Sequence, residues 1–117
     1  MIEFGAPSPN LPITVLQAGP QFSQDGATQL EYGYNIVQDV SYNYGSLQLP
    51  PAVPGAMVTL ANQNNFASWL VTVYAKNGTT DTINGQPNGT AFDVAVGVVP
   101  LFLCSVAGQW FANIQPD

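Results

Sequence analysis

The sequence predicts an all-β domain, and three observations support that prediction. Apolar and polar side chains alternate from about residue 27 onward, which is the period of a half-buried strand. β-branched and aromatic residues dominate these runs, and turn residues recur about every 8–12 positions. The one helical candidate, NIVQDV at residues 35–40, is too short to be stable alone. We therefore expect a compact β-sandwich or barrel-like domain of the jelly-roll or β-tulip type.

The N-terminal segment differs in character from the rest of the chain. Prolines at positions 7, 9, 12 and 20 forbid a helix and disfavour pairing inside a sheet. We expect residues 1–26 to form an extended arm with one short strand near Ile13–Gln17, and residues 27–117 to form the β-rich core domain. The candidate partner-binding anchors are the isolated apolar residues of the arm, namely Ile2, Phe4, Leu11, Ile13 and Val15.

Seven runs with the composition of strands follow the arm, and a strand is expected in each. They cover residues 28–36, 41–49, 56–62, 66–76, 90–97, 99–106 and 107–114. The segment PPAVPG, residues 50–55, interrupts them and predicts a turn or an edge segment. The run VPLFLCSV, residues 99–106, is apolar on both faces and is predicted to be a central buried strand. In the last run Trp110, Ala112 and Ile114 share one face.

Between two of these runs lies the segment NGTTDTINGQPNGT, residues 77–90. Its three Asn-Gly pairs accept the positive φ angles that tight turns require, so we interpret it as turn structure. Asn77 and Asn88 also match the N-glycosylation pattern, although no export signal accompanies them. A calcium site formed by Asp81, Asn84 and Asp93 is conceivable, but the segment lacks the ligand density of a known calcium loop.

The charge composition excludes several functions. Lys76 is the only base, no histidine is present, and the net charge is −6. Nucleic acids and anionic membranes are not expected as partners, because both require clustered Lys or Arg. Without imidazole no histidine-based triad or transition-metal cluster can form within one chain, and nothing places the acidic pairs Glu31–Asp39 or Asp81–Asp93 in a cleft. We expect no enzyme, no cofactor and no metal, and we expect the single Cys104 to be buried.

Aromatic residues leave two interpretations open. Leu30, Tyr32, Tyr34 and Ile36 alternate with polar residues, and Tyr42 and Tyr44 follow. The tyrosines Tyr32, Tyr34, Tyr42 and Tyr44 are either ordinary core and rim residues or an oligomer interface, where tyrosine is enriched. A carbohydrate-binding module is a further alternative, in which Trp69, Trp110 and the tyrosines would stack on sugar rings. Because both tryptophans lie in apolar runs, we expect them to be buried.

The C-terminal half resembles a recurrent segment of small virion proteins of tailed bacteriophages. The resemblance covers Trp69–Ala112. It rests on an apolar strand followed by the turn DTING at residues 81–85, then Gly97, Leu101-Phe102 and finally the segment AGQW at residues 107–110. It is greatest with capsid decoration (cement) proteins, which are small, β-rich and commonly trimeric. Head fibres, tail parts and receptor-binding knobs use similar segments and remain alternatives.

The resemblance implies an assembly role. The chain would bind the major capsid protein on the outer surface of the capsid and bridge adjacent subunits, as a homotrimer. The arm could add a strand to an open sheet edge of a partner. The start of the sequence has no signal-peptide pattern, and no apolar window is long enough for a membrane span, so we expect synthesis in the host cytoplasm and a final location in the virion.

Overall fold

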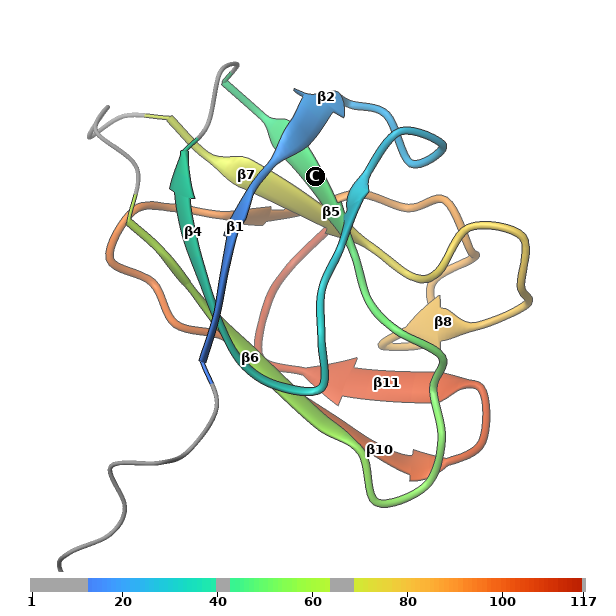
Figure 1. Cartoon of the computed structure of the whole chain (residues 1–117). Helices are drawn as coiled ribbons and strands as arrows, with labels where there is room; N and C mark the ends of the chain where they lie inside the picture. The colour runs from blue at the N-terminus through green and yellow to red at the C-terminus, as the bar shows by residue number, and fades with distance from the viewer. Residues whose placement is uncertain (1–12, 40–42, 64–68, 117) are drawn as a thin grey trace, which may run out of the picture.

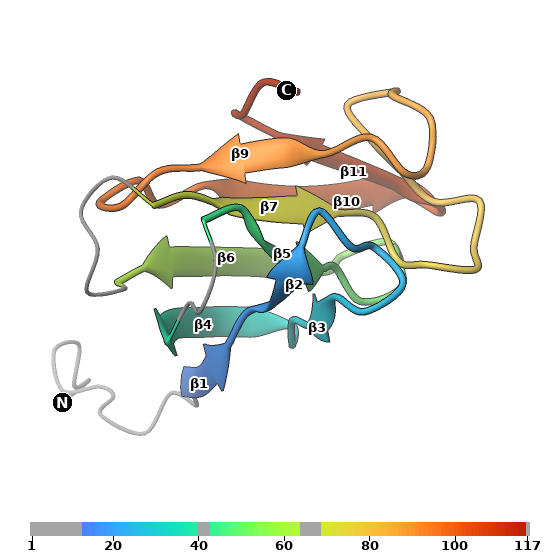
Figure 2. The ribbon, with the colours of Figure 1, turned by 90° about the horizontal axis from the view of Figure 1, so that it is seen from above.

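The computed structural model describes residues 13–39, 43–63 and 69–116, and within them the chain forms strands and no helix. This confirms the all-β prediction. Sheet A has the strand order β1 (Ile13–Gln17), β4 (Gly33–Asp39), β6 (Met57–Asn62), β10 (Leu101–Val106), β11 (Gln109–Ala112) and β8 (Thr82–Ile83). Sheet B has the order β2 (Gly19–Gln21), β5 (Gly45–Gln48), β7 (Val71–Tyr74) and β9 (Phe92–Val94), with β3 (Thr28–Gln29) also paired to β5. Figures 1 and 2 show the two sheets as two layers.

The chain alternates between the two sheets from β4 to β9, so that neighbouring strands of one sheet are joined through a strand of the other. Parallel neighbours cannot be joined by a tight hairpin and need such a crossover. Strand β4 therefore pairs parallel with β6, and β5 pairs parallel with β7. Five of the nine strand pairings within the described residues are parallel, whereas a jelly roll is built from antiparallel pairs.

Proline explains part of this path. The segment between β5 and β6 contains Pro50, Pro51 and Pro54. Proline has no backbone donor, so these positions cannot extend β5 or β6 by donating to a neighbouring strand. The turn predicted at residues 50–55 is confirmed, and it carries the chain across to sheet A.

The core lies between the sheets. Its three largest fully buried side chains are Trp110 and Phe102 from sheet A and Phe92 from sheet B. Cys104 is buried in the same cluster, as predicted. In β11 the buried Trp110 lies between the exposed Gln109 and Phe111, which is the expected alternation of a strand with one buried face.

The prediction that residues 99–106 form a strand buried on both faces is wrong. Strand β10 is central in sheet A, but only its Phe102 and Cys104 face is buried. Leu101 is 43% exposed and Leu103 is 48% exposed. The reason is that sheet B covers one face of sheet A, and no described segment forms a further layer over the other face.

Strand β4 also differs from its predicted face. Tyr34 faces outward, and Asn35 and Val37 are buried instead. The alternation is reset at Gly33, whose φ of +92° marks the start of the strand. Burial of Asn35 is stabilised because its side chain accepts a hydrogen bond from the backbone N–H of Glu31 at 2.9 Å and donates to the Thr59 carbonyl at 3.1 Å.

The strand predicted near Ile13–Gln17 is confirmed as β1. It pairs parallel with β4, and β2 pairs antiparallel with β5. Residues 13–21 thus belong to the folded domain, which moves this part of the expected arm into the two sheets. Residues 1–12 lie outside the described residues.

Candidate protein-binding surface

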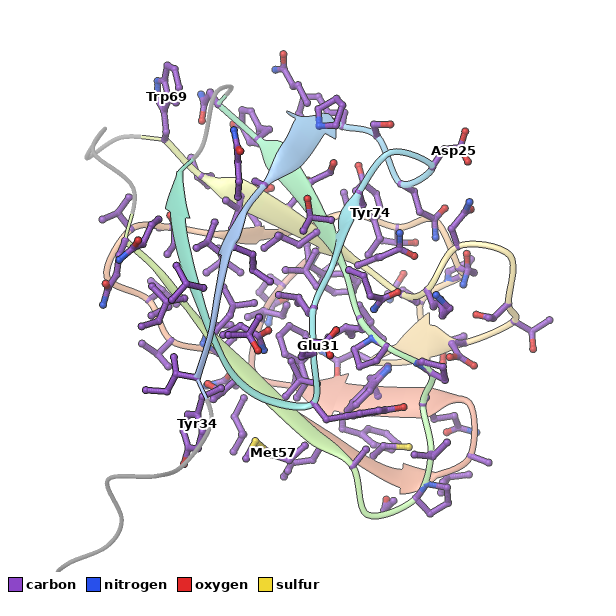
Figure 3. The ribbon with its side chains drawn as sticks, in the orientation of Figure 1. Asp25, Glu31, Tyr34, Met57, Trp69 and Tyr74 are labelled. Carbon is purple, nitrogen blue, oxygen red and sulfur yellow. The ribbon has the colours of Figure 1, made fainter. Side chains whose placement is uncertain are left out.

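One face of sheet A points away from sheet B. The exposed Gln38 in β4 and Gln109 in β11 lie on this face, and apolar side chains make up most of the rest. The strand register aligns them in three cross-strand rows. These are Ile13, Tyr34, Thr59 and Leu101; then Val15, Ile36 and Ala61; then Met57, Leu103 and Phe111. We call these ten residues the outer face. Figure 3 shows Tyr34 and Met57 on the side of β6 that faces away from sheet B.

Two hollows lie on the outer face. The first has a volume of about 190 Å³ and lies between Ile13, Tyr34, Ile36 and Val99. The second has a volume of about 350 Å³ and lies along Leu101, Leu103 and Phe111. Because Leu101 stands in the first row and borders the second hollow, the two hollows belong to one continuous surface. A surface of this kind, with apolar hollows, is typical of a protein contact site.

The outer face carries no charge. No charged side chain lines either hollow in the described structure. The rows contain two hydroxyl groups, those of Tyr34 and Thr59. The Thr59 Oγ1 already donates to the Pro100 carbonyl at 2.8 Å. The base Lys76 lies elsewhere and donates to Gln29 Oε1 at 2.8 Å. Contacts made by this surface must therefore be non-ionic.

Two of the five predicted arm anchors belong to this surface. Ile13 and Val15 are each 57% exposed and stand on β1, the edge strand of sheet A. An edge strand without charged side chains is open to pairing with another chain. Ile2, Phe4 and Leu11 lie outside the described residues.

The predicted tyrosine set is not gathered on one face. Tyr34 belongs to the outer face, whereas Tyr44 is stacked on Phe22 beside sheet B, with ring centroids 4.7 Å apart. The Tyr32 hydroxyl donates to the Pro51 carbonyl at 2.7 Å. Burial, followed by the nearby Asp81 carboxylate and Cys104 thiol, raises the pKa of Tyr32 above its ordinary value. Tyr42 lies outside the described residues.

The turn interpretation of residues 77–90 is confirmed in part, because the short strand β8 lies within this segment and pairs with β11. Gly78, Asn84, Gly85 and Gly89 all have positive φ angles. Both hydrogens of the Asn88 amide are used, by the carbonyls of Lys76 at 3.1 Å and Asp81 at 2.9 Å. A glycan on Asn88 would break this arrangement.

Two of the three residues considered for calcium already have a backbone partner for a side-chain oxygen. Asp81 Oδ2 accepts from the Ala52 N–H at 2.9 Å, and Asn84 Oδ1 accepts from the Ala112 N–H at 2.8 Å. In the part of the chain that the structure describes, no group of three or more acidic, cysteine or histidine residues could hold a metal ion. The same residues contain no helix with the length and apolarity of a membrane span.

The two tryptophans differ in their surroundings. Trp110 is fully buried, as expected, and its Nε1 donates to the Pro50 carbonyl at 3.3 Å. Trp69 is only partly buried against the core, and Figure 3 places it far from Tyr34. Trp110 therefore cannot stack on a sugar ring, which removes one of the two platforms that a carbohydrate site would use.

Sequence reasoning missed Leu101, Leu103 and Phe111 as surface residues. The available signal was the apolar character of residues 99–106 on both faces. When a sequence predicts two sheets and no helix to cover them, a strand that is apolar on both faces must expose one of those faces.

The chain matches no protein-family model, and it shows no significant similarity to a curated protein or to a solved structure.

Proposed function

We propose that this chain is a structural assembly protein, and specifically a capsid decoration protein of a tailed bacteriophage. The observation that carries the assembly role is the outer face, which is broad, apolar and uncharged. Such a surface suits contact with another protein and offers few polar groups for chemistry on a small substrate. The capsid location is supported by the resemblance of Trp69–Ala112 to virion proteins.

In this proposal residues 1–12 bind the major capsid protein. They precede β1 directly, so a partner that they bind is brought to the edge of sheet A. Ordering an extended segment costs roughly 1–2 kcal/mol per residue in backbone entropy. The apolar anchors Ile2, Phe4 and Leu11 would have to offset that cost, because the segment has no basic residue for an ion pair.

The rest of the proposal concerns class and location. The two-sheet core supports describing the domain as a β-sandwich, and the protein would act without catalysis or a cofactor. It would sit on the capsid outer surface, and the resemblance implies a homotrimer. Another virion part, such as a head fibre, a tail component or a receptor-binding knob, would use the outer face equally well.

Removal of residues 1–12 is expected to abolish binding to capsid shells of the source virus and leave a folded domain. The truncation has to end at Pro12, because a longer one would remove β1 and β2. A full-length variant with Ile2→Ser, Phe4→Ser and Leu11→Ser tests the anchors while keeping every proline. Co-sedimentation with shells measures binding, and circular dichroism checks the fold.

Electron microscopy of purified particles with a specific antibody separates the head from the tail as the location. Saturation of shells by the truncated protein at wild-type stoichiometry would contradict the role of the segment. Absence of the protein from finished particles would contradict the virion role itself.

A further inference from the structure

The outer face leaves a large apolar area exposed on a small domain. Its most exposed residues, Ile13, Val15, Tyr34, Leu101, Leu103 and Phe111, each have between 43% and 57% of their surface in water. Together they leave several hundred Å² of apolar surface, which approaches the roughly 800 Å² that each partner buries in a stable interface. Most monomeric proteins do not expose a contiguous apolar patch larger than a few hundred Å².

The chemistry of the face limits what can cover it. A charged partner would find no opposite charge there, and a sugar or nucleotide would find few hydrogen-bonding groups. The polar residues Gln63 and Asn113 line only part of the two hollows. The occupant must therefore present an apolar and uncharged surface of its own.

We propose that the occupant is a second copy of this chain, with the outer faces of two copies packed against each other about a two-fold axis, in place of the homotrimer that the resemblance implies. An isologous pair uses the same patch on both subunits and needs only one self-complementary surface. A closed trimer needs two different patches on each subunit, whereas the large exposed apolar residues of the strands of sheet A, other than Val106, form one continuous patch.

Charge does not oppose this contact. The acids whose side chains the structure describes are Asp25, Glu31, Asp81 and Asp93, and none of them is part of the rows on the outer face. Burial of the face thus requires no desolvation of an ion, which would be strongly unfavourable. The inference rests on the proposed assembly role of sheet A, and it does not depend on the capsid as the other partner.

Sedimentation equilibrium of the full chain tests the pair. The wild-type protein is expected to have twice the mass of one chain, and Leu103→Asp is expected to weaken self-association by about a hundred-fold or more. The reason is that Leu103 lies between Met57 and Phe111, so the new carboxylate would be buried without a partner. Leu103→Thr retains a strand-forming residue and is expected to weaken association by about ten-fold, because apolar contact is lost.

Phe22→Asp is the matched control. Phe22 is 52% exposed, close to the 48% of Leu103, but it lies beside sheet B with Tyr44. Its φ of +50° is one that Asp tolerates. This variant is expected to keep the wild-type mass. A folded Leu103→Asp protein that stays paired, or a control that dissociates equally, would overturn the proposal.

Three other outcomes would also overturn the proposal. The first is a wild-type mass of three chains, and the second is a wild-type monomer at about 0.1 mM, a concentration at which even a pair of modest affinity would form. The third is a monomer that binds vesicles of neutral lipid through the same face. Shell binding separates the two proposals. A pair that does not bind shells would retain this inference and reject the capsid role. Shell binding by a wild-type monomer would retain the capsid role and reject the pair.

Discussion

Replacement of Trp110 by alanine is expected to lower the free energy of unfolding by about 3–5 kcal/mol, the range for large aromatic residues removed from a core. Trp110 is the largest of the fully buried side chains in the described part of the domain. It packs in the cluster shared by both sheets, and its Nε1 donates to the Pro50 carbonyl. The substitution would leave a cavity between the sheets and an unpaired carbonyl. Urea unfolding followed by circular dichroism measures the change.

Phe111→Ala is the control, since Phe111 is the next residue but is 45% exposed on the outer face. Its effect on the free energy of unfolding should be within about 1 kcal/mol. Both substitutions belong in the Leu103→Asp background at one protein concentration, so that self-association does not add to the difference. Equal losses for Trp110→Ala and Phe111→Ala would show that β11 does not bury the face described.

Replacement of Asn84 by alanine is expected to lower the free energy of unfolding by about 2–4 kcal/mol. The Asn84 Nδ2 donates to the carbonyls of Ala112 at 2.8 Å and Ile114 at 3.3 Å, and Oδ1 accepts from the Ala112 N–H at 2.8 Å. The side chain thereby continues the pairing past the end of β8, to the last residue of β11 and to Ile114 beyond it. Loss of these partners leaves backbone groups unpaired, at about 1–3 kcal/mol, and alanine at a positive φ adds roughly 1 kcal/mol.

Two variants divide this effect. Asn84→Gly removes the three hydrogen bonds but accepts the φ of +52°, so it isolates the contribution of the bonds. Asn77→Ala removes an exposed amide whose side-chain partner is Asp25, and it should change stability by less than about 1 kcal/mol. Unfolding by urea again provides the measurement. An Asn84→Gly protein as stable as the wild type would mean that the side chain does not hold β8 to β11.

The local features of the fold could be predicted because local residue patterns determine them. Alternation identified β9 and β11 as strands, a short strand was expected in the arm at β1, and the Asn-Gly pairs identified the positive φ angles at Gly78, Gly85 and Gly89. The path of the chain could not be predicted in this way. Alternation shows that a segment is a strand, but it does not show which sheet the strand joins or whether its neighbours run parallel.

The candidate surface was predicted only in part, for a related physical reason. Ile13 and Val15 were recognised because they are apolar residues in a segment with little core of its own, and Tyr34 was recognised because tyrosine is enriched at interfaces. Leu101 and Leu103 alternate with Phe102 and Cys104, which are equally apolar, so the pattern did not distinguish the buried face from the exposed one. In β4 the alternation indicated the wrong buried face. The buried residue Asn35 is polar, and its side chain is hydrogen-bonded to backbone groups that the sequence alone does not reveal.

One measurement tests most directly the claim that this protein assembles through an uncharged sheet face. It is the apparent molecular mass of the wild-type protein in solution, determined at low and at high salt. Raising the ionic strength from about 0.1 M to about 1 M shortens the Debye length from about 10 Å to about 3 Å. Because each copy carries a net charge of −6 and the face carries none, we expect sedimentation equilibrium to show an association that is unchanged or tighter at high salt. Dissociation on addition of salt, or a monomer under both conditions, would contradict the claim.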